Sequence, residues 1–154
     1  MKSEPDEGTV LDLLGSLWAV NHGLHAVSKR MRSRVGVTGP QRVVLRMVGR
    51  EDGISPGRLA RAIHDDPSTL TGVLHRLEAR GLLERTADPV DRRRFHLHLT
   101  EAGAKVNEVR EGTVEEAVRA AIRRLAPSQL AATAGVLGAL VEELALRSGA
   151  AESP

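Results

Sequence analysis

Residues 55–99, with the sequence SPGRLARAIHDDPSTLTGVLHRLEARGLLERTADPVDRRRFHLHL, decide the fold, because two short helix patterns precede two short strand patterns. Ser55-Pro56 predicts the first helix start, with serine as N-cap and proline at the first helical position. Asp66-Pro67 predicts the second start, and Gly81 is a typical stop signal. The expected inner faces comprise Leu59, Ala60 and Ile63, then Leu70, Val73, Leu74 and Leu77. Two helices joined by so short a break predict a helix-turn-helix.

The apolar period changes from 3.6 residues to 2 after Gly81, which predicts strands at residues 82–86 and 94–99. In the second strand apolar residues alternate with His96 and His98. The connection between them, residues 87–93, is too long and too charged for a tight hairpin turn. We therefore expect a β-wing that projects beyond the helix-turn-helix.

Long helical patterns lie on both sides of this lobe. Residues 10–34 carry apolar residues at spacings of three, four and seven, and Thr38 with Gln41 forms a capping box for the next helix. A continuous helix is expected from Thr100 to about Leu125, and a last one from Pro127. Their apolar stripes are too long for one small lobe to cover, so we expect them to pack against a second copy of the chain.

The predicted fold class is therefore mainly α-helical with a small β-wing. A winged helix-turn-helix lobe (residues 38–99) combines with N- and C-terminal helical dimerisation regions (residues 9–34 and 101–146). We expect one domain over residues 9–146, with flexible tails at residues 1–8 and 147–154.

Composition excludes several classes of protein. The chain has no cysteine, which rules out disulfides, thiol nucleophiles and cysteine-based zinc sites. Trp18 and Phe95 are the only aromatic residues, so stacking on single-stranded nucleic acid is not expected. No apolar run approaches the roughly 18 residues of a membrane span, and the acidic start does not resemble a signal peptide. We expect a cytoplasmic protein with no membrane association.

Several segments together resemble the MarR family, in the order in which that family carries them. They are Thr38-Gly39-Pro40-Gln41, Leu59-Ala60, Ser68-Thr69-Leu70-Thr71, residues 76–85 (RLEARGLLER), residues 88–93 (DPVDRR) and Leu99-Thr100-Glu101-Ala102-Gly103. The resemblance covers roughly residues 10 to 146. It implies a homodimeric winged helix-turn-helix regulator that binds pseudo-palindromic operators and is often released by a small aromatic acid. Gly72 departs from the pattern, since many members carry a longer polar residue there.

The expected DNA-binding residues fall into two groups. A helix in the major groove reads bases mainly with its N-terminal residues, and an arginine on a wing can enter a narrow minor groove. Asp91 and Arg93 share a face of an extended wing, so the carboxylate is expected to orient the guanidinium. Arg92 and Arg94 are expected to neutralise phosphates, and Arg85 to serve in either role. The full set comprises Ser68, Thr69, Thr71, Gly72, His75, Arg76, Arg85, Asp91, Arg92, Arg93 and Arg94. Ordinary solvated faces and surface ion pairs remain the structural alternative for each residue.

The resemblance also implies a crevice for an aromatic carboxylate between the first helix and the DNA-binding lobe, which is the less specific expectation. Trp18 and His22 lie four residues apart on one helix face, where they could stack on an aromatic acid while Arg42 or Arg46 meets its carboxylate. A plain dimer-core role for Trp18 explains the same residue. The histidine pairs lack the additional ligands that zinc needs, and no catalytic motif is present, so we expect no metal, no cofactor and no enzymatic activity. Two alternatives remain: a winged-helix module for protein–protein contact, and a constitutive repressor without a ligand.

Overall fold

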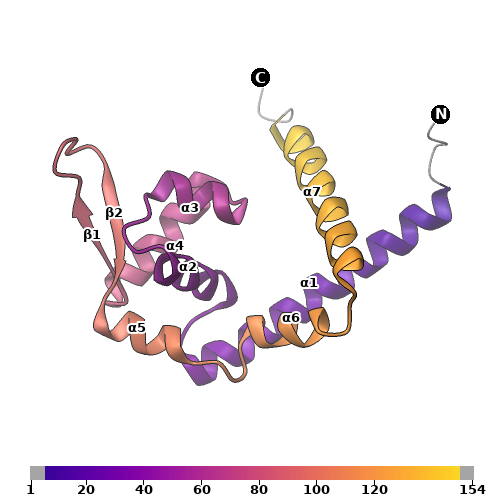
Figure 1. The fold of residues 1–154 in the computed structure, drawn as a ribbon, viewed down its shortest axis with the longest axis horizontal. Helices are drawn as coiled ribbons and strands as arrows, with labels where there is room; N and C mark the ends of the chain where they lie inside the picture. The colour runs from indigo at the N-terminus through magenta and orange to yellow at the C-terminus, as the bar shows by residue number, and fades with distance from the viewer. Residues whose placement is uncertain (1–5, 150–154) are drawn as a thin grey trace. The chain divides into compact units, whose positions relative to one another are not determined.

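The computed structural model describes residues 6–149, which divide into two compact units, Met1–Val114 and Glu115–Pro154. The helices and strands follow one another as in Figure 1. They are α1 (Glu7–Val35), α2 (Gly39–Arg50), α3 (Pro56–Ile63), α4 (Pro67–Ala79), β1 (Leu83–Ala87), β2 (Phe95–Leu99), α5 (Glu101–Glu108), α6 (Val114–Ile122) and α7 (Pro127–Gly149). The predicted mainly helical fold with a two-stranded wing is confirmed.

The core lies in the first unit, between α2, α3, α4 and the base of the wing. Strands β1 and β2 pair antiparallel with Leu83 opposite Leu99, and Ile54 adds an isolated bridge to Leu97. The residues predicted for the inner faces of α3 and α4 are all buried except Ile63, which packs against the core from its edge. Fully buried core residues include Leu45, Leu59, Leu70, Leu74, Leu77 and Leu97. Hydrophobic burial therefore fixes how α3, α4 and the wing lie relative to one another.

Side-chain caps begin the helices where the sequence indicates. The amide of Thr38 donates to Gln41 Oε1 at 3.0 Å as part of a complete capping box. Ser55 Oγ accepts from the Arg58 amide at 3.3 Å, and an Asp66 carboxylate oxygen accepts from the Ser68 amide at 2.7 Å. These contacts satisfy amides that have no partner within their own helices.

The continuous helix predicted from Thr100 to about Leu125 is wrong. Helix α5 ends at Glu108 and α6 begins at Val114, with Gly112 at φ +68° between them. Past the end of α5 the carbonyl oxygen of Val109 accepts a hydrogen bond from the buried Arg42 guanidinium at 2.6 Å. This contact between α2 and Val109 holds the chain at the break. The spacing of apolar residues in the sequence does not predict such a contact.

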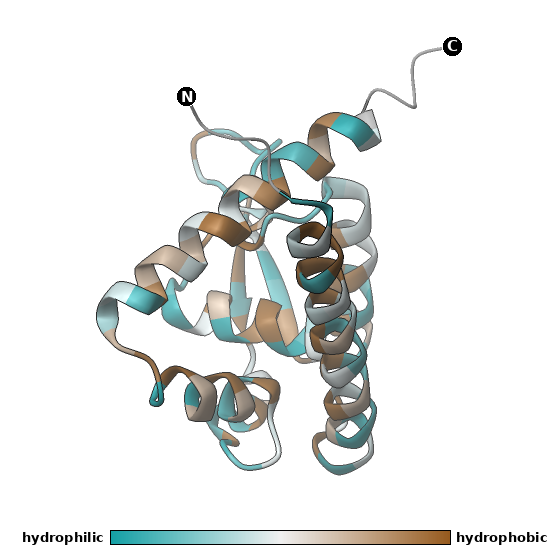
Figure 2. Cartoon of the chain, turned by 90° about the vertical axis from the view of Figure 1, so that its right-hand side faces the viewer, coloured by the Kyte–Doolittle hydropathy of each residue, from teal (hydrophilic) through white to brown (hydrophobic). Residues whose placement is uncertain are grey.

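The second unit contains α6 from Glu115 onward and α7, and no residue described there is buried. Helix α7 carries hydrophobic segments along its length (Figure 2), among them the exposed Leu130, Val136, Leu137, Val141 and Leu144. By length and composition residues 127–148 could span a membrane, which corrects the expectation that no segment approaches that size. This segment is hydrophobic overall because it is rich in alanine, leucine and valine and has few charged residues.

The residues predicted as tails are described only in part. Residues 7 and 8 already belong to α1, and α7 continues to Gly149. The remaining tail residues, 1–5 and 150–154, lie outside the described residues.

Candidate nucleic-acid interface

The outer face of α4 exposes the polar residues that the sequence predicts for it. Thr69, Thr71, His75 and Arg76 are exposed, while Leu70, Val73, Leu74 and Leu77 are buried beneath them. The Ser68 hydroxyl donates to the Asp66 carboxylate, and the Thr71 hydroxyl donates to the Pro67 carbonyl at 2.7 Å. Both hydroxyl protons are therefore engaged within the helix, so Ser68 and Thr71 face outward chiefly as hydrogen-bond acceptors.

Gly72 is the half-buried member of this face, because Arg76 folds back over it. A β-carbon at residue 72 would lie 3.7 Å from Arg76 Nη1, which is ordinary van der Waals contact. The glycine thus leaves a shallow surface on the helix, and the Arg76 guanidinium covers it. At this point of the helix the exposed side chain is therefore that of Arg76.

The wing turn is held by its own acidic residue, Asp88. One Asp88 oxygen accepts from the amides of Val90 and Asp91 at 2.8 and 2.9 Å, and the Asp88 amide donates to the Arg94 carbonyl at 2.9 Å. Hydrogen bonds from the Asp91 amide, from His96 and from the Val90 amide lower the pKa of Asp88 to about 2. The turn is therefore built around an ionised carboxylate at neutral pH.

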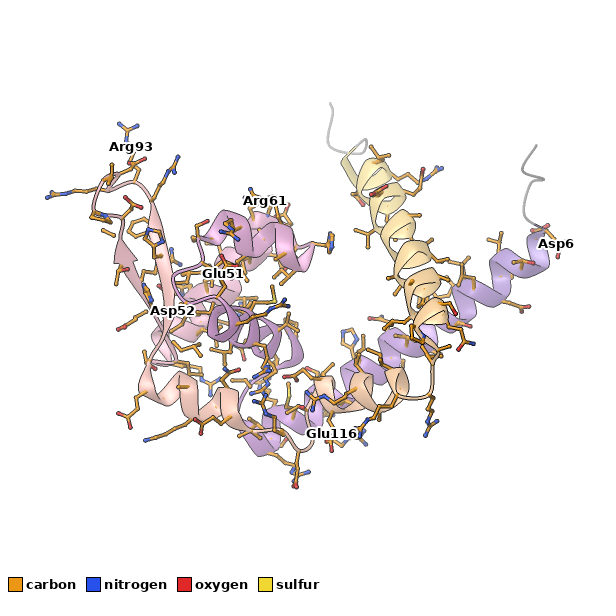
Figure 3. The ribbon with its side chains drawn as sticks, viewed as in Figure 1. Asp6, Glu51, Asp52, Arg61, Arg93 and Glu116 are labelled. Carbon is orange, nitrogen blue, oxygen red and sulfur yellow. The ribbon has the colours of Figure 1, made fainter. Side chains whose placement is uncertain are left out.

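The predicted pairing of Asp91 with the Arg93 guanidinium is not found. Asp91 Oδ1 accepts from the Arg93 backbone amide at 3.1 Å, whereas Asp91 Oδ2 lies 3.4 Å from Nε of Arg94. On this turn the residue three positions after Asp91, which is Arg94, lies next to the carboxylate, whereas Arg93 does not. The Arg93 side chain points away from the body of the lobe at the wing tip (Figure 3).

Arg85 is more constrained than the sequence indicates. Its guanidinium contacts both carboxylate oxygens of Glu78 on α4, with Nη2 2.9 Å from Oε2. Such a two-point contact fixes the arginine and links β1 to α4. Its role in the structure is to join these two elements, and any contact with phosphate would have to compete with Glu78.

A groove between α3 and the wing contains basic residues that the sequence analysis did not single out. It has a volume of about 690 Å³, and its charged lining comprises Glu51, Arg58, Arg61, Asp88, Arg93 and Arg94. Arg61 on α3 and Arg93 at the wing tip lie on the same side of the lobe (Figure 3). In helix-turn-helix proteins the first helix crosses the DNA backbone. Applied to residues 55–63, this rule would have indicated Arg58 and Arg61 as candidate contacts with the DNA backbone.

The four residues predicted for a ligand crevice do not surround one cavity. Trp18 is 66% exposed, whereas Arg42 is 1% exposed and donates to backbone carbonyls at the end of α5. Arg46 donates to Asn107 Oδ1 at 3.1 Å. A cavity of about 280 Å³ does lie between α1 and α2, and its lining comprises Asn21, Leu24, His25, Ser28, Gly39, Pro40, Val43 and Val114. The α1 residues that line this cavity lie on the helix face next to Trp18 and His22.

The known proteins that this chain resembles are transcriptional regulators. The MarR family model matches residues 37–95. The chain is 39% identical over 70 residues to the transcriptional regulator HosA of Escherichia coli O111:H-, covering 46% of this chain and 52% of HosA. It is 34% identical over 98 residues to an HTH-type transcriptional repressor of Mycobacterium bovis, covering 63% of this chain and 70% of the repressor. The first curated relatives are matched over about half of their length.

A solved structure of a relative supports the same fold. The structure describing regulation of DNA binding of Bordetella bronchiseptica BpsR by 6-hydroxynicotinic acid has a TM-score of 0.66 and 26% identity. The match covers 84% of this chain and 98% of that one. These named relatives are regulators, in agreement with a chain that carries no catalytic motif.

Proposed function

Because the chain belongs to the MarR family, we propose that it is a cytoplasmic, DNA-binding transcriptional repressor that acts as a homodimer and responds to a small aromatic acid. The observation that carries the proposal is the placement of two surfaces on one lobe. The polar outer face of α4 and the exposed tip of the wing belong to the same unit, and a buried core joins them. In this arrangement α4 enters the major groove and Arg93 the neighbouring minor groove.

A homodimer explains the exposed apolar residues of the long helices. On α1, Leu11, Val20 and Leu24 are among the exposed apolar residues, and α7 carries a similar exposed stripe. A single chain leaves this surface in water, whereas a symmetric partner buries it twice. Two copies of α4 would then contact half-sites about one DNA turn, roughly 34 Å, apart.

The effector proposal rests on the cavity between α1 and α2. A cavity of roughly 150 Å³ accommodates benzene, so about 280 Å³ has room for one aromatic ring with a carboxylate. Ser28 Oγ accepts from the Gly39 amide at 2.7 Å, which leaves its own proton free to donate. His25 Nδ1 lies 2.9 Å from the Asn21 carbonyl, so Nε2 is the ring atom left for the cavity. Ser28 Oγ is our candidate donor to the carboxylate, whereas Nε2 of a neutral His25 ring is an acceptor and suits a hydroxyl group on the acid. The BpsR structure supports the chemical class.

DNA binding is tested by selecting duplexes from a random pool and measuring affinity against salt concentration. A steep fall in affinity with salt, together with a preference for the selected sequence, is expected. Weak binding without sequence preference would indicate a protein–protein module instead. A folded monomer in sedimentation at micromolar concentration would contradict the dimer.

The effector is tested separately by thermal shift with phenolic and heterocyclic acids, with and without the selected duplex. By linkage, an acid that weakens DNA binding must itself bind less tightly to the DNA complex. If no acid raises the melting temperature, the chain is a ligand-independent repressor.

A further inference from the structure

His96 lies at the base of the wing and bridges it to the helix-turn-helix lobe. Its Nδ1 is 2.8 Å from the carbonyl oxygen of Gly53, in the link between α2 and α3. Its Nε2 is 2.8 Å from Oδ2 of Asp88, the residue that organises the wing turn. A single imidazole ring therefore spans two segments that are far apart in sequence.

Both partners of His96 can only accept hydrogen bonds. A carbonyl oxygen has no proton to give, and Asp88 is ionised because its pKa lies at about 2. Each ring nitrogen must therefore carry a proton for both contacts to form, and only the imidazolium form has two. Consistent with this geometry, the hydrogen bond to Asp88, and after it the one to Gly53, raises the pKa of His96.

His98, two residues along the same strand, provides the internal contrast. Its Nδ1 lies 2.8 Å from Asp52 Oδ1, and its Nε2 lies 3.0 Å from the hydroxyl of Thr86. A hydroxyl can donate as well as accept, so a neutral His98 ring satisfies both contacts with one proton. The demand for two protons is specific to His96.

We propose that His96 is a protonation-dependent positioning residue, which ties the wing turn at Asp88 to Gly53 only while its ring is charged. This tie adds to the β-bridge between Ile54 and Leu97, which does not depend on the ring. The inference rests on the proposed DNA-binding function, since the wing is the element that it positions. A neutral ring can donate to Asp88 or to Gly53 but not to both. Deprotonation therefore releases one end of the bridge.

The other charged groups that line the groove containing His96 come from three segments. Arg93 and Arg94 belong to the wing, Arg58 and Arg61 to α3, and Glu51 to the end of α2. The arginines oppose a charged imidazole, but Glu51 pairs with Arg58 at 2.9 Å. Arginine and carboxylate side chains ordinarily keep their charge between about pH 6 and pH 9, so the change in this range belongs to the histidine.

The sign of the pH dependence follows from the raised pKa of His96. The bridge is fully present below about pH 6.5, the ordinary value for histidine, and is lost as the pH rises through the raised value. DNA binding should therefore weaken on the alkaline side. The DNA phosphates, when bound, favour the charged ring further.

The first test is a ¹⁵N NMR titration of the histidine rings in the whole protein, with His96→Gln and His98→Gln to assign the signals. We expect both His96 nitrogens to be protonated at pH 6 and the ring to titrate above pH 6.5. Asp88→Asn, which removes the charged acceptor, should lower that midpoint. A single protonated nitrogen at pH 6, or a midpoint at or below 6.5, would overturn the proposal.

The second test measures affinity for the selected duplex at about pH 6 and pH 8.5. The wild type should lose about threefold to tenfold more affinity over this range than His96→Gln, the effect of one net hydrogen bond. His98→Gln should keep the wild-type profile, and His75 on α4 is present in all three proteins. An unchanged profile in His96→Gln would overturn the proposal. Absence of DNA binding at any pH would instead refute the proposed function, while leaving the NMR result intact.

Discussion

Gly103 of α5 lies directly against the carbonyl oxygen of Leu82, with no room for a side chain between them. That carbonyl already accepts from the Thr100 amide at 3.3 Å, and Thr100 Oγ1 accepts from the Gly103 amide at 3.0 Å. The start of α5 is therefore packed onto the segment that precedes β1, backbone against backbone. This contact fixes where the helix after the wing begins.

Replacing Gly103 with alanine should destabilise the protein by about 1–3 kcal/mol, the usual cost of forcing extra volume into a packed site. The added β-carbon would overlap the Leu82 oxygen, which is backbone and cannot rotate away. Urea unfolding followed by circular dichroism measures the change. A Gly103→Ala variant as stable as the wild type would show that α5 can move off this segment at little cost.

The opposite sign is expected for Gly72→Ala on α4. A β-carbon there has ordinary contact distances to Arg76, and alanine is favoured over glycine inside a helix. The variant should be about 0.5–1 kcal/mol more stable in the same urea experiment. A loss of stability would mean that the Arg76 guanidinium cannot shift away from residue 72.

Arg42 should prove structural and not part of an effector site. Its guanidinium is buried and donates to the carbonyls of Asn107 and Val109 at the end of α5. Arg42→Met leaves these oxygens without that donor and should cost about 1–3 kcal/mol. Arg42→Lys should recover only part of the loss, because an ammonium lacks the planar fork of donors. Unchanged stability with lost effector binding would reverse this assignment.

The two wing arginines should differ in their effect on DNA binding. Arg93→Ala should reduce affinity for the selected duplex more than for random DNA, by about 1–3 kcal/mol for each copy of the residue in the dimer. Arg92→Ala should weaken both duplexes alike and reduce the salt slope by about one for each phosphate that the arginine neutralises. Fluorescence anisotropy at several salt concentrations separates the two patterns. Equal weakening on both duplexes for both variants would reduce the wing to a nonspecific clamp.

Acid should loosen the wing turn through Asp88. Because its folded pKa is about 2 and its ordinary value is 3.8, the stabilisation is complete above pH 3.8 and disappears as the pH falls through 2. The Val90 and Asp91 amides, which donate to this carboxylate, report the change through their NMR shifts. Asp88→Ala should show the loosened turn already at neutral pH. Identical amide shifts in that variant would contradict the prediction.

The sequence predicts those parts of the fold that depend on neighbours along the chain. Caps at Thr38, Ser55 and Asp66 act within three residues, and the buried stripe of α4 follows its own helical period. The predicted strand bounds agree with the structure to within one residue for the same reason. Caps and apolar periods involve residues that are close together in the sequence, so a short segment is enough to predict them.

Contacts between distant segments could not be predicted in the same way. His96 and Gly53 are separated by 43 positions, and Arg42 and Val109 by 67. The exchange of Arg94 for Arg93 as the partner of Asp91 depends on the path of the turn, which residue spacing alone does not specify. These contacts depend on how the chain returns on itself after the core has formed.

The hydrogen bonds around Asp88 have a kinetic consequence for the encounter with DNA. A wing that is already shaped before contact is preorganised, so docking requires little ordering of the backbone between β1 and β2. The exposed arginines at its tip can then be drawn toward the duplex by long-range attraction. Association should accordingly be fast and strongly slowed by salt, and differences in affinity among operator sequences should arise mainly in the rate of dissociation.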